Sequence, residues 1–143
     1  MSRPRDTSRR AWPWIAPQWL RRTIFALYAV ALFLGTHWPQ LDLGEAPVRH
    51  FDKLLHFGAF GAWTCLLVGC SFFGPALSKR NLRWCLAIAL FYAGLDELLQ
   101  VIPALNRQAD WWDYGANTLG VLCAMAACLV LRGTMDRAAR ETG

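Results

Sequence analysis

The chain has 143 residues, of which 55% are hydrophobic and 17% charged, and its formal net charge is +5. Soluble domains average about 25% charged residues, so this composition disfavours a soluble domain, and the length leaves room for one domain only. The basic residues stand in the two tails and in one short link instead of along one folded face, so nucleic acid is not an expected partner.

Four apolar stretches follow one another along the chain, at residues 23–38, 54–77, 82–102 and 112–131. A helix that crosses ~30 Å of hydrocarbon needs about 20 residues, and the first stretch reaches this length by including Trp19 and Leu20. We therefore predict an all-α protein, a polytopic bundle of four transmembrane helices spanning residues 19–132. Residues 1–18 are predicted to be a flexible basic tail, and residues 133–143 a second tail.

Breaker residues set the expected ends of the middle two helices. The pair Gly74-Pro75 is predicted to close the second helix, and Pro103 to end the third.

The placement of lysine and arginine predicts the orientation of the four spans. Basic residues dominate the N-terminal tail, the link around residues 79–83 and the C-terminal tail, whereas the other two links carry more acidic than basic residues. Because basic flanks stay on the cytoplasmic side, both termini are predicted to be cytoplasmic.

Polar residues recur where the second, third and fourth predicted helices reach the outer surface. Asp52 and His56 are four residues apart, Glu97 and Gln100 are three apart, and the series from Arg107 through Asp110 and Asp113 to Asn117 follows spacings of three, three and four. Such spacings put each set on one face of its helix. We predict one polar pocket with the following members: Asp52, Lys53, His56, Glu97, Gln100, Arg107, Asp110, Asp113 and Asn117.

Roles within this pocket follow from charge. A carboxylate below the membrane interface needs a partner, so we expect Glu97 to pair with Lys53 or Arg107. Arg107 is expected to bridge Asp110 or Asp113, and Asn117 to anchor the fourth helix through a hydrogen bond. Simpler interpretations stay open, because Asp52 and Asp113 could merely complement positive helix N-termini.

Small residues predict where helices approach closely. They are Gly58 and Gly61 on the second helix, and Gly115, Gly120 and Ala124 on the fourth.

The polar pattern Asp52-Lys53-x-x-His56, Glu97-x-x-Gln100 and Arg107-x-x-Asp110-x-x-Asp113-x-x-x-Asn117-x-x-Gly120 resembles the VanZ-like family of small bacterial membrane proteins. The resemblance covers about residues 25–131, and Ala124 departs from it where a second glycine-type residue is expected. It implies a multi-pass protein of the bacterial cytoplasmic membrane and a link to cell-wall precursors or to resistance against the glycopeptide teicoplanin. It implies no established reaction.

Three functions are compatible with these residues. The main expectation is a non-enzymatic envelope protein whose pocket binds a lipid headgroup, a lipid-linked wall precursor or another membrane protein, without a cofactor. The first alternative is a metal-dependent enzyme acting on a lipid phosphate, with Asp52, His56, Glu97, Asp110 and Asp113 as candidate ligands of Mg²⁺ or Mn²⁺. The second is an ion- or proton-coupled carrier.

Overall fold

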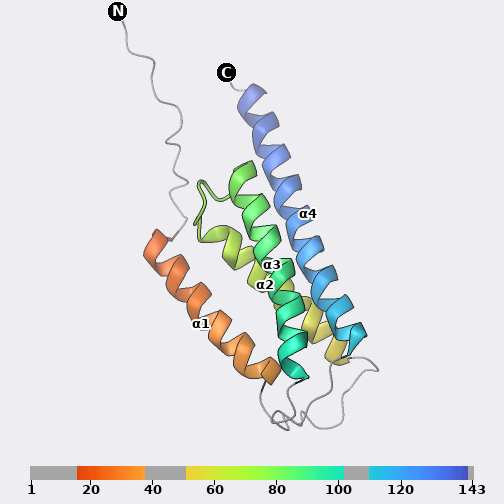
Figure 1. Ribbon diagram of the computed structural model, residues 1–143. Helices are drawn as coiled ribbons and strands as arrows, with labels where there is room; N and C mark the ends of the chain where they lie inside the picture. The colour runs from red at the N-terminus through yellow and green to blue at the C-terminus, as the bar shows by residue number, and fades with distance from the viewer. Residues whose placement is uncertain (1–15, 38–50, 102–109, 142–143) are drawn as a thin grey trace, which may run out of the picture.

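The computed structural model describes residues 16–37, 51–101 and 110–141, and these residues form four α-helices and no strand (Figure 1). Figure 1 shows the start of α1, the α2–α3 turn and the end of α4 at one end of the bundle, with the remaining helix ends at the other. The prediction of an all-α fold is confirmed. The helices are α1 (Gln18–His37), α2 (Phe51–Gly69), α3 (Lys79–Gln100) and α4 (Trp111–Glu141).

Helix α2 ends at Gly69, five residues before the Gly74-Pro75 pair that is predicted to close it. The chain turns after Cys70, where Ser71 has a φ of 55° and Gly74 has a φ of 131°. The fully buried Asn81 holds this turn: its Nδ2 donates to the carbonyls of Val68 (3.1 Å) and Ala76 (2.8 Å), and its Oδ1 accepts from the N–H of Phe73 (3.1 Å). The prediction was wrong here because an apolar composition does not reveal a turn whose backbone groups are satisfied by a side chain.

Replacing Asn81 with alanine is expected to lower the free energy of unfolding by about 2–3 kcal/mol, because buried backbone groups lose their partners. The Ser78 hydroxyl caps α3 by accepting from the N–H of Asn81 (3.2 Å), and Ser78→Ala should cost only about 1 kcal/mol. Denaturation of the detergent-solubilised variants, followed by circular dichroism, measures both values. A reversed order of the two losses would contradict this role of Asn81.

Helix α4 continues to Glu141, so most of the segment predicted as a C-terminal tail is helical. Its 31 residues correspond to about 46 Å. Arg132 joins this end to the rest of the fold, since its Nη1 donates to the carbonyl of Leu77 (3.2 Å) and its Nε lies 3.5 Å from Asp136. Most of the other predicted tail, residues 1–15, lies outside the described residues.

Helices α2 and α4 cross at two of the predicted small residues, Gly61 and Gly120. A Cβ atom built on Gly120 would overlap the backbone carbonyl of Phe57, and one on Gly61 would lie 3.4 Å from the carbonyl oxygen of Gly120. Ala124 is also buried, but Gly58 and Gly115 have open space beside them. The two backbones therefore touch at one crossing point.

An aromatic cluster fills the adjoining core between α2 and α3. Tyr92 stacks on Trp63 with ring centroids 4.9 Å apart and on Phe60 at 5.7 Å. Helix α1 packs against the same region through Phe25, which lies 5.4 Å from Trp63, and through the Tyr28 hydroxyl, which donates to the carbonyl of Ala59 (3.0 Å).

Large apolar side chains cover the outside of the bundle. They include Leu27 on α1, Phe91 on α3 and Val130 on α4, each about two-thirds or more exposed. Exposed apolar surface of this extent is typical of contact with a membrane or a partner. Helices α1 and α4 are long and apolar enough to cross a membrane, whereas α2 and α3 do not meet that criterion. Four membrane spans therefore stay a prediction.

Candidate functional site

Lys53, in the first turn of α2, links α2 to the start of α4. Its Nζ lies 2.7 Å from Asp110, 2.5 Å from Asp113 and 2.8 Å from the neighbouring Asp52. Asp113 is largely buried, with 14% of its side chain exposed, whereas Asp52 and Asp110 reach the surface. Three carboxylates therefore share one ammonium group at the point where two helices begin.

A second chain of hydrogen bonds continues from α2 through α4 to α3. The amide nitrogen of Asn117 donates to Oε1 of Glu97 (3.1 Å), which leaves the amide oxygen to accept from Nδ1 of His56 (3.0 Å). His56 Nδ1 therefore carries a proton, and its Nε2 lies 3.9 Å from Asp113. Asn117 is fully buried, so this amide fixes the relative positions of three helices.

A third polar group joins α3 to α1 and was not among the predicted site residues. Fully buried Asp96 accepts a hydrogen bond from the Thr36 hydroxyl (2.8 Å) and another from the amide of Gln100 (3.2 Å). His37 lies beside it, with Nδ1 3.7 Å from the Asp96 carboxylate. The sequence signal was the pair Thr36-His37 at the end of the first apolar stretch, together with a second carboxylate next to Glu97.

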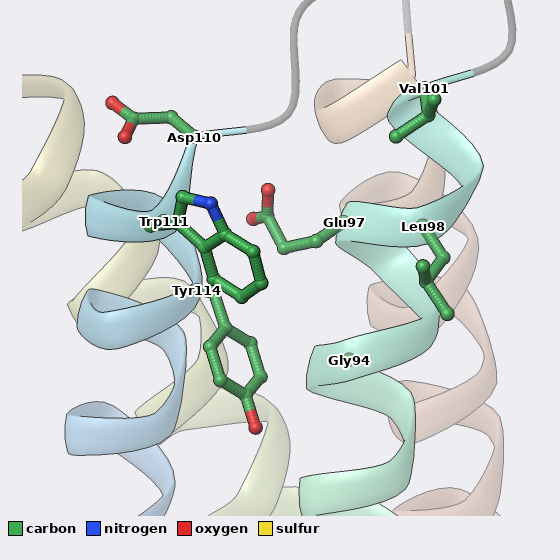
Figure 2. A pocket seen from close by; sticks show the side chains of 7 residues that line it. All are labelled: Gly94, Glu97, Leu98, Val101, Asp110, Trp111 and Tyr114. Atoms are coloured by element: carbon green, nitrogen blue, oxygen red, sulfur yellow. The ribbon is translucent and has the colours of Figure 1, made fainter.

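A cavity of about 360 Å³ opens between α3 and α4 at this end of the bundle. Figure 2 shows Glu97 reaching from α3 into the gap, with the ring of Trp111 beside its carboxylate and Tyr114 farther along α4. Glu97 is 7% exposed, and its Oε2 accepts no hydrogen bond from a described side chain. Apart from Glu97 and Asp110 the lining is Gly94, Leu98, Val101, Trp111 and Tyr114.

The structure thus brings most of the predicted pocket residues to one end, but with different pairings. Lys53 contacts three aspartates and not Glu97, whose described partner is Asn117. Gln100 bonds to Asp96 and so turns toward α1. Asn117 does anchor the fourth helix by hydrogen bonds, as predicted. Arg107, with its expected bridge to Asp110 or Asp113, lies outside the described residues.

The described residues contain no group of three or more His, Cys, Asp or Glu side chains arranged to hold a metal ion. Of the five candidate ligands, three form ion pairs with Lys53, namely Asp52, Asp110 and Asp113. The other two, His56 and Glu97, form hydrogen bonds with Asn117. The geometry of these residues is that of an ion-pair and hydrogen-bond network.

Asp110 lies just before α4, and the contribution of its charge to stability can be tested by changing the pH. The Lys53 ammonium, followed by the N–H of Trp112, holds the pKa of Asp110 below its usual range. A lowered pKa means that the stabilising contribution is complete above the unfolded-state value of about 3.9 and is lost as pH falls through the folded-state value.

Asp110→Asn is therefore expected to be less stable than wild type at pH 7, with the difference shrinking toward pH 3. Asparagine caps helices as well as aspartate does, so the variant removes the charge but keeps the cap on Trp112. Thermal unfolding of both proteins across this pH range measures the difference. A constant difference would show that the ion pair with Lys53 does not contribute.

The fold and the site define an all-helical membrane protein with a polar network at one end. The chain matches the VanZ/LLP1 family over residues 6–132, which is most of its length, and it belongs to that family. No curated protein matches the chain, and no solved structure matches it either. The family assignment predicted from the polar pattern is thus confirmed.

Proposed function

We propose that this protein spans the bacterial cytoplasmic membrane four times, with both termini in the cytoplasm, and binds the headgroup of a lipid or lipid-linked wall precursor at its outer end. It does so as a binding protein without turnover. The observation that carries the proposal is the polar network across α2, α3 and α4 beside a cavity with a mostly apolar lining. Such a combination suits a ligand with one polar and one apolar part.

The distribution of charge supports the orientation. Among the described residues, one end of the bundle carries the basic residues Lys79, Arg80, Arg83 and Arg132. The first turns of α1 lie at the same end and add Arg21 and Arg22. The opposite end carries five carboxylates, and Lys53 is the cation described there. These carboxylates belong to Asp52, Asp96, Glu97, Asp110 and Asp113. Basic flanks are retained in the cytoplasm, so the carboxylate end faces outward.

The lengths of α2 and α3 fit a crossing despite their polar ends. Helix α2 has 19 residues and α3 has 22, which corresponds to about 28 Å and about 33 Å. A hydrocarbon core of ~30 Å is therefore spanned if the polar turns lie at the interfaces. From the resemblance to VanZ-like proteins we infer a contribution to resistance against the glycopeptide teicoplanin. Expression in a susceptible host, followed by a teicoplanin susceptibility assay, tests this inference.

A topology reporter tests the four spans. Alkaline phosphatase fused after residue 107 is expected to be active outside, whereas the same enzyme fused after Glu141 is expected to be inactive, because phosphatase folds only in the oxidising periplasm. A green fluorescent protein fusion after Glu141 serves as the complementary control. Activity of the phosphatase at Glu141 would refute the orientation.

Ligand binding is tested by native mass spectrometry from gentle detergent, comparing wild type with Glu97→Gln. Glutamine can still accept the hydrogen bond from Asn117, so the variant removes the charge and leaves the helix contact. Glu141→Gln makes the same chemical change on an exposed residue at the other end of α4. We expect wild type and Glu141→Gln to retain a lipid that Glu97→Gln loses. Equal retention by all three proteins would contradict binding at this end.

A further inference from the structure

One carboxylate oxygen of Glu97 can accept a hydrogen bond from a ligand in the cavity. Oε1 is occupied by Asn117, while Oε2 is buried and accepts no hydrogen bond from a described side chain. A buried carboxylate oxygen without a donor is unfavourable, so an incoming group that donates a hydrogen bond to it gains affinity. The carboxylate points into the cavity in Figure 2, where such a group can reach it.

The surrounding charge selects a cationic donor. Asp110 also lines the cavity, and Asp113 stands three residues farther along the chain, in the first turn of α4. Lys53, the cation described at this end, already contacts three aspartates. Adding an anionic group beside Glu97 would therefore bring like charges together, whereas an ammonium group would relieve the excess negative charge.

The remaining lining fits an amphiphile. The ring of Trp111 stands beside the carboxylate and Tyr114 lines the cavity farther along α4, and aromatic faces attract ammonium groups. Leu98 and Val101, which are 69% and 59% exposed, continue the cavity onto the outer surface of α3. An apolar chain can lie along this surface while its headgroup reaches Glu97.

We propose that the cavity between α3 and α4 binds an amphiphile whose headgroup carries a primary ammonium, held by Oε2 of Glu97 and the ring of Trp111, with its apolar chain along Leu98 and Val101. This inference rests on the proposed function and names the chemical class of its ligand. A primary ammonium is favoured over a quaternary one because only the former can donate a hydrogen bond to Oε2.

The test is a titration of the full-length protein in detergent with lipids that differ at the amine, with binding measured by native mass spectrometry. The probes are dioleoyl phosphatidylethanolamine, its N-acetyl derivative, dioleoyl phosphatidylcholine and dioleoyl phosphatidylglycerol. Wild type is expected to bind phosphatidylethanolamine about tenfold or more tightly than the other three, as a charge-assisted hydrogen bond implies. Soluble glycerophosphoethanolamine, which lacks the chains, is expected to compete poorly, and dodecylamine is expected to compete well.

Three variants make the result specific to this cavity. Glu97→Gln should abolish the preference for the amine, whereas Glu141→Gln should keep it. Trp111 is 87% exposed, so Trp111→Leu leaves the packing intact and should weaken amine binding about threefold.

Two outcomes with the amine probes would overturn the inference. One is equal binding of phosphatidylethanolamine and its N-acetyl derivative. The other is amine binding that is seen only in Arg107→Gln, because Arg107 would then be the counter-charge of Glu97 in the wild-type protein. A Glu97-dependent preference for phosphatidylglycerol would refute the amine but preserve the proposed function. Absence of any Glu97-dependent lipid binding would refute both.

Discussion

Replacing Gly120 with alanine is expected to force α2 and α4 apart and to lower the free energy of unfolding by about 2–3 kcal/mol, the range for an overpacked core. The added Cβ would overlap the carbonyl oxygen of Phe57, and it would lie 3.0 Å from the Phe57 carbonyl carbon and 3.1 Å from the nitrogen of Gly61. All three atoms belong to the backbone of α2, so no side-chain rotation can relieve the contact. Denaturation in mixed micelles, followed by tryptophan fluorescence, measures the loss.

Gly115 provides a matched control on the same helix, because a Cβ at this position meets nothing within 4 Å. Gly115→Ala is expected to be neutral or to stabilise α4 by up to about 1 kcal/mol through the higher helix propensity of alanine. Similar losses for both variants would mean that glycine is needed in α4 for a reason other than contact with α2. A selective loss for Gly120→Ala establishes the crossing point.

The helical class and the order of the elements could be predicted because apolar stretches long enough to span a bilayer have few alternatives to a helix. The residues at which the helices end were harder to predict. The second apolar stretch contains a turn held by Asn81, and the polar C-terminal segment continues as helix to Glu141 with Arg132 and Asp136 paired at a spacing of four. Neither feature changes the apolar pattern, and the breaker pair Gly74-Pro75 lies within the turn instead of at the end of α2.

In the candidate site, the individual contacts between side chains were also hard to predict from the sequence. Helical spacing placed Glu97 and Gln100 on one face, but the structure joins Glu97 to α4 and Gln100, through Asp96, to α1. Periodicity defines which residues share a face of one helix, whereas the choice of partner depends on how neighbouring helices are rotated and offset. For this reason the sequence predicted that Lys53 lies at the polar end, but it did not predict that Lys53 pairs with the aspartates instead of Glu97.

Replacing Lys53 with methionine is expected to lower the free energy of unfolding by about 2–3 kcal/mol at neutral pH. Methionine keeps most of the length of the side chain but leaves Asp110 and Asp113 without the ammonium that they share. Losing one partner of a buried ion pair costs about 3–5 kcal/mol, and partial exposure of Lys53 (22%) and Asp110 (40%) reduces this value through screening by water. Thermal and chemical unfolding in detergent at low and high salt measure the loss.

A double-mutant cycle separates the ion pair from other effects of the substitution. Asp113→Asn removes the charge of the more buried aspartate, and the double variant should recover part of the stability lost in Lys53→Met, because fewer uncompensated charges then remain. Lys79→Met, at the opposite end of the bundle, makes the same chemical change without a described ion pair and should alter stability by less than about 0.5 kcal/mol. If the losses from Lys53→Met and Asp113→Asn simply add, the contact between α2 and α4 through Lys53 does not stabilise the fold. A coupling of about 1 kcal/mol or more would instead show that one lysine holds together the polar ends of two helices.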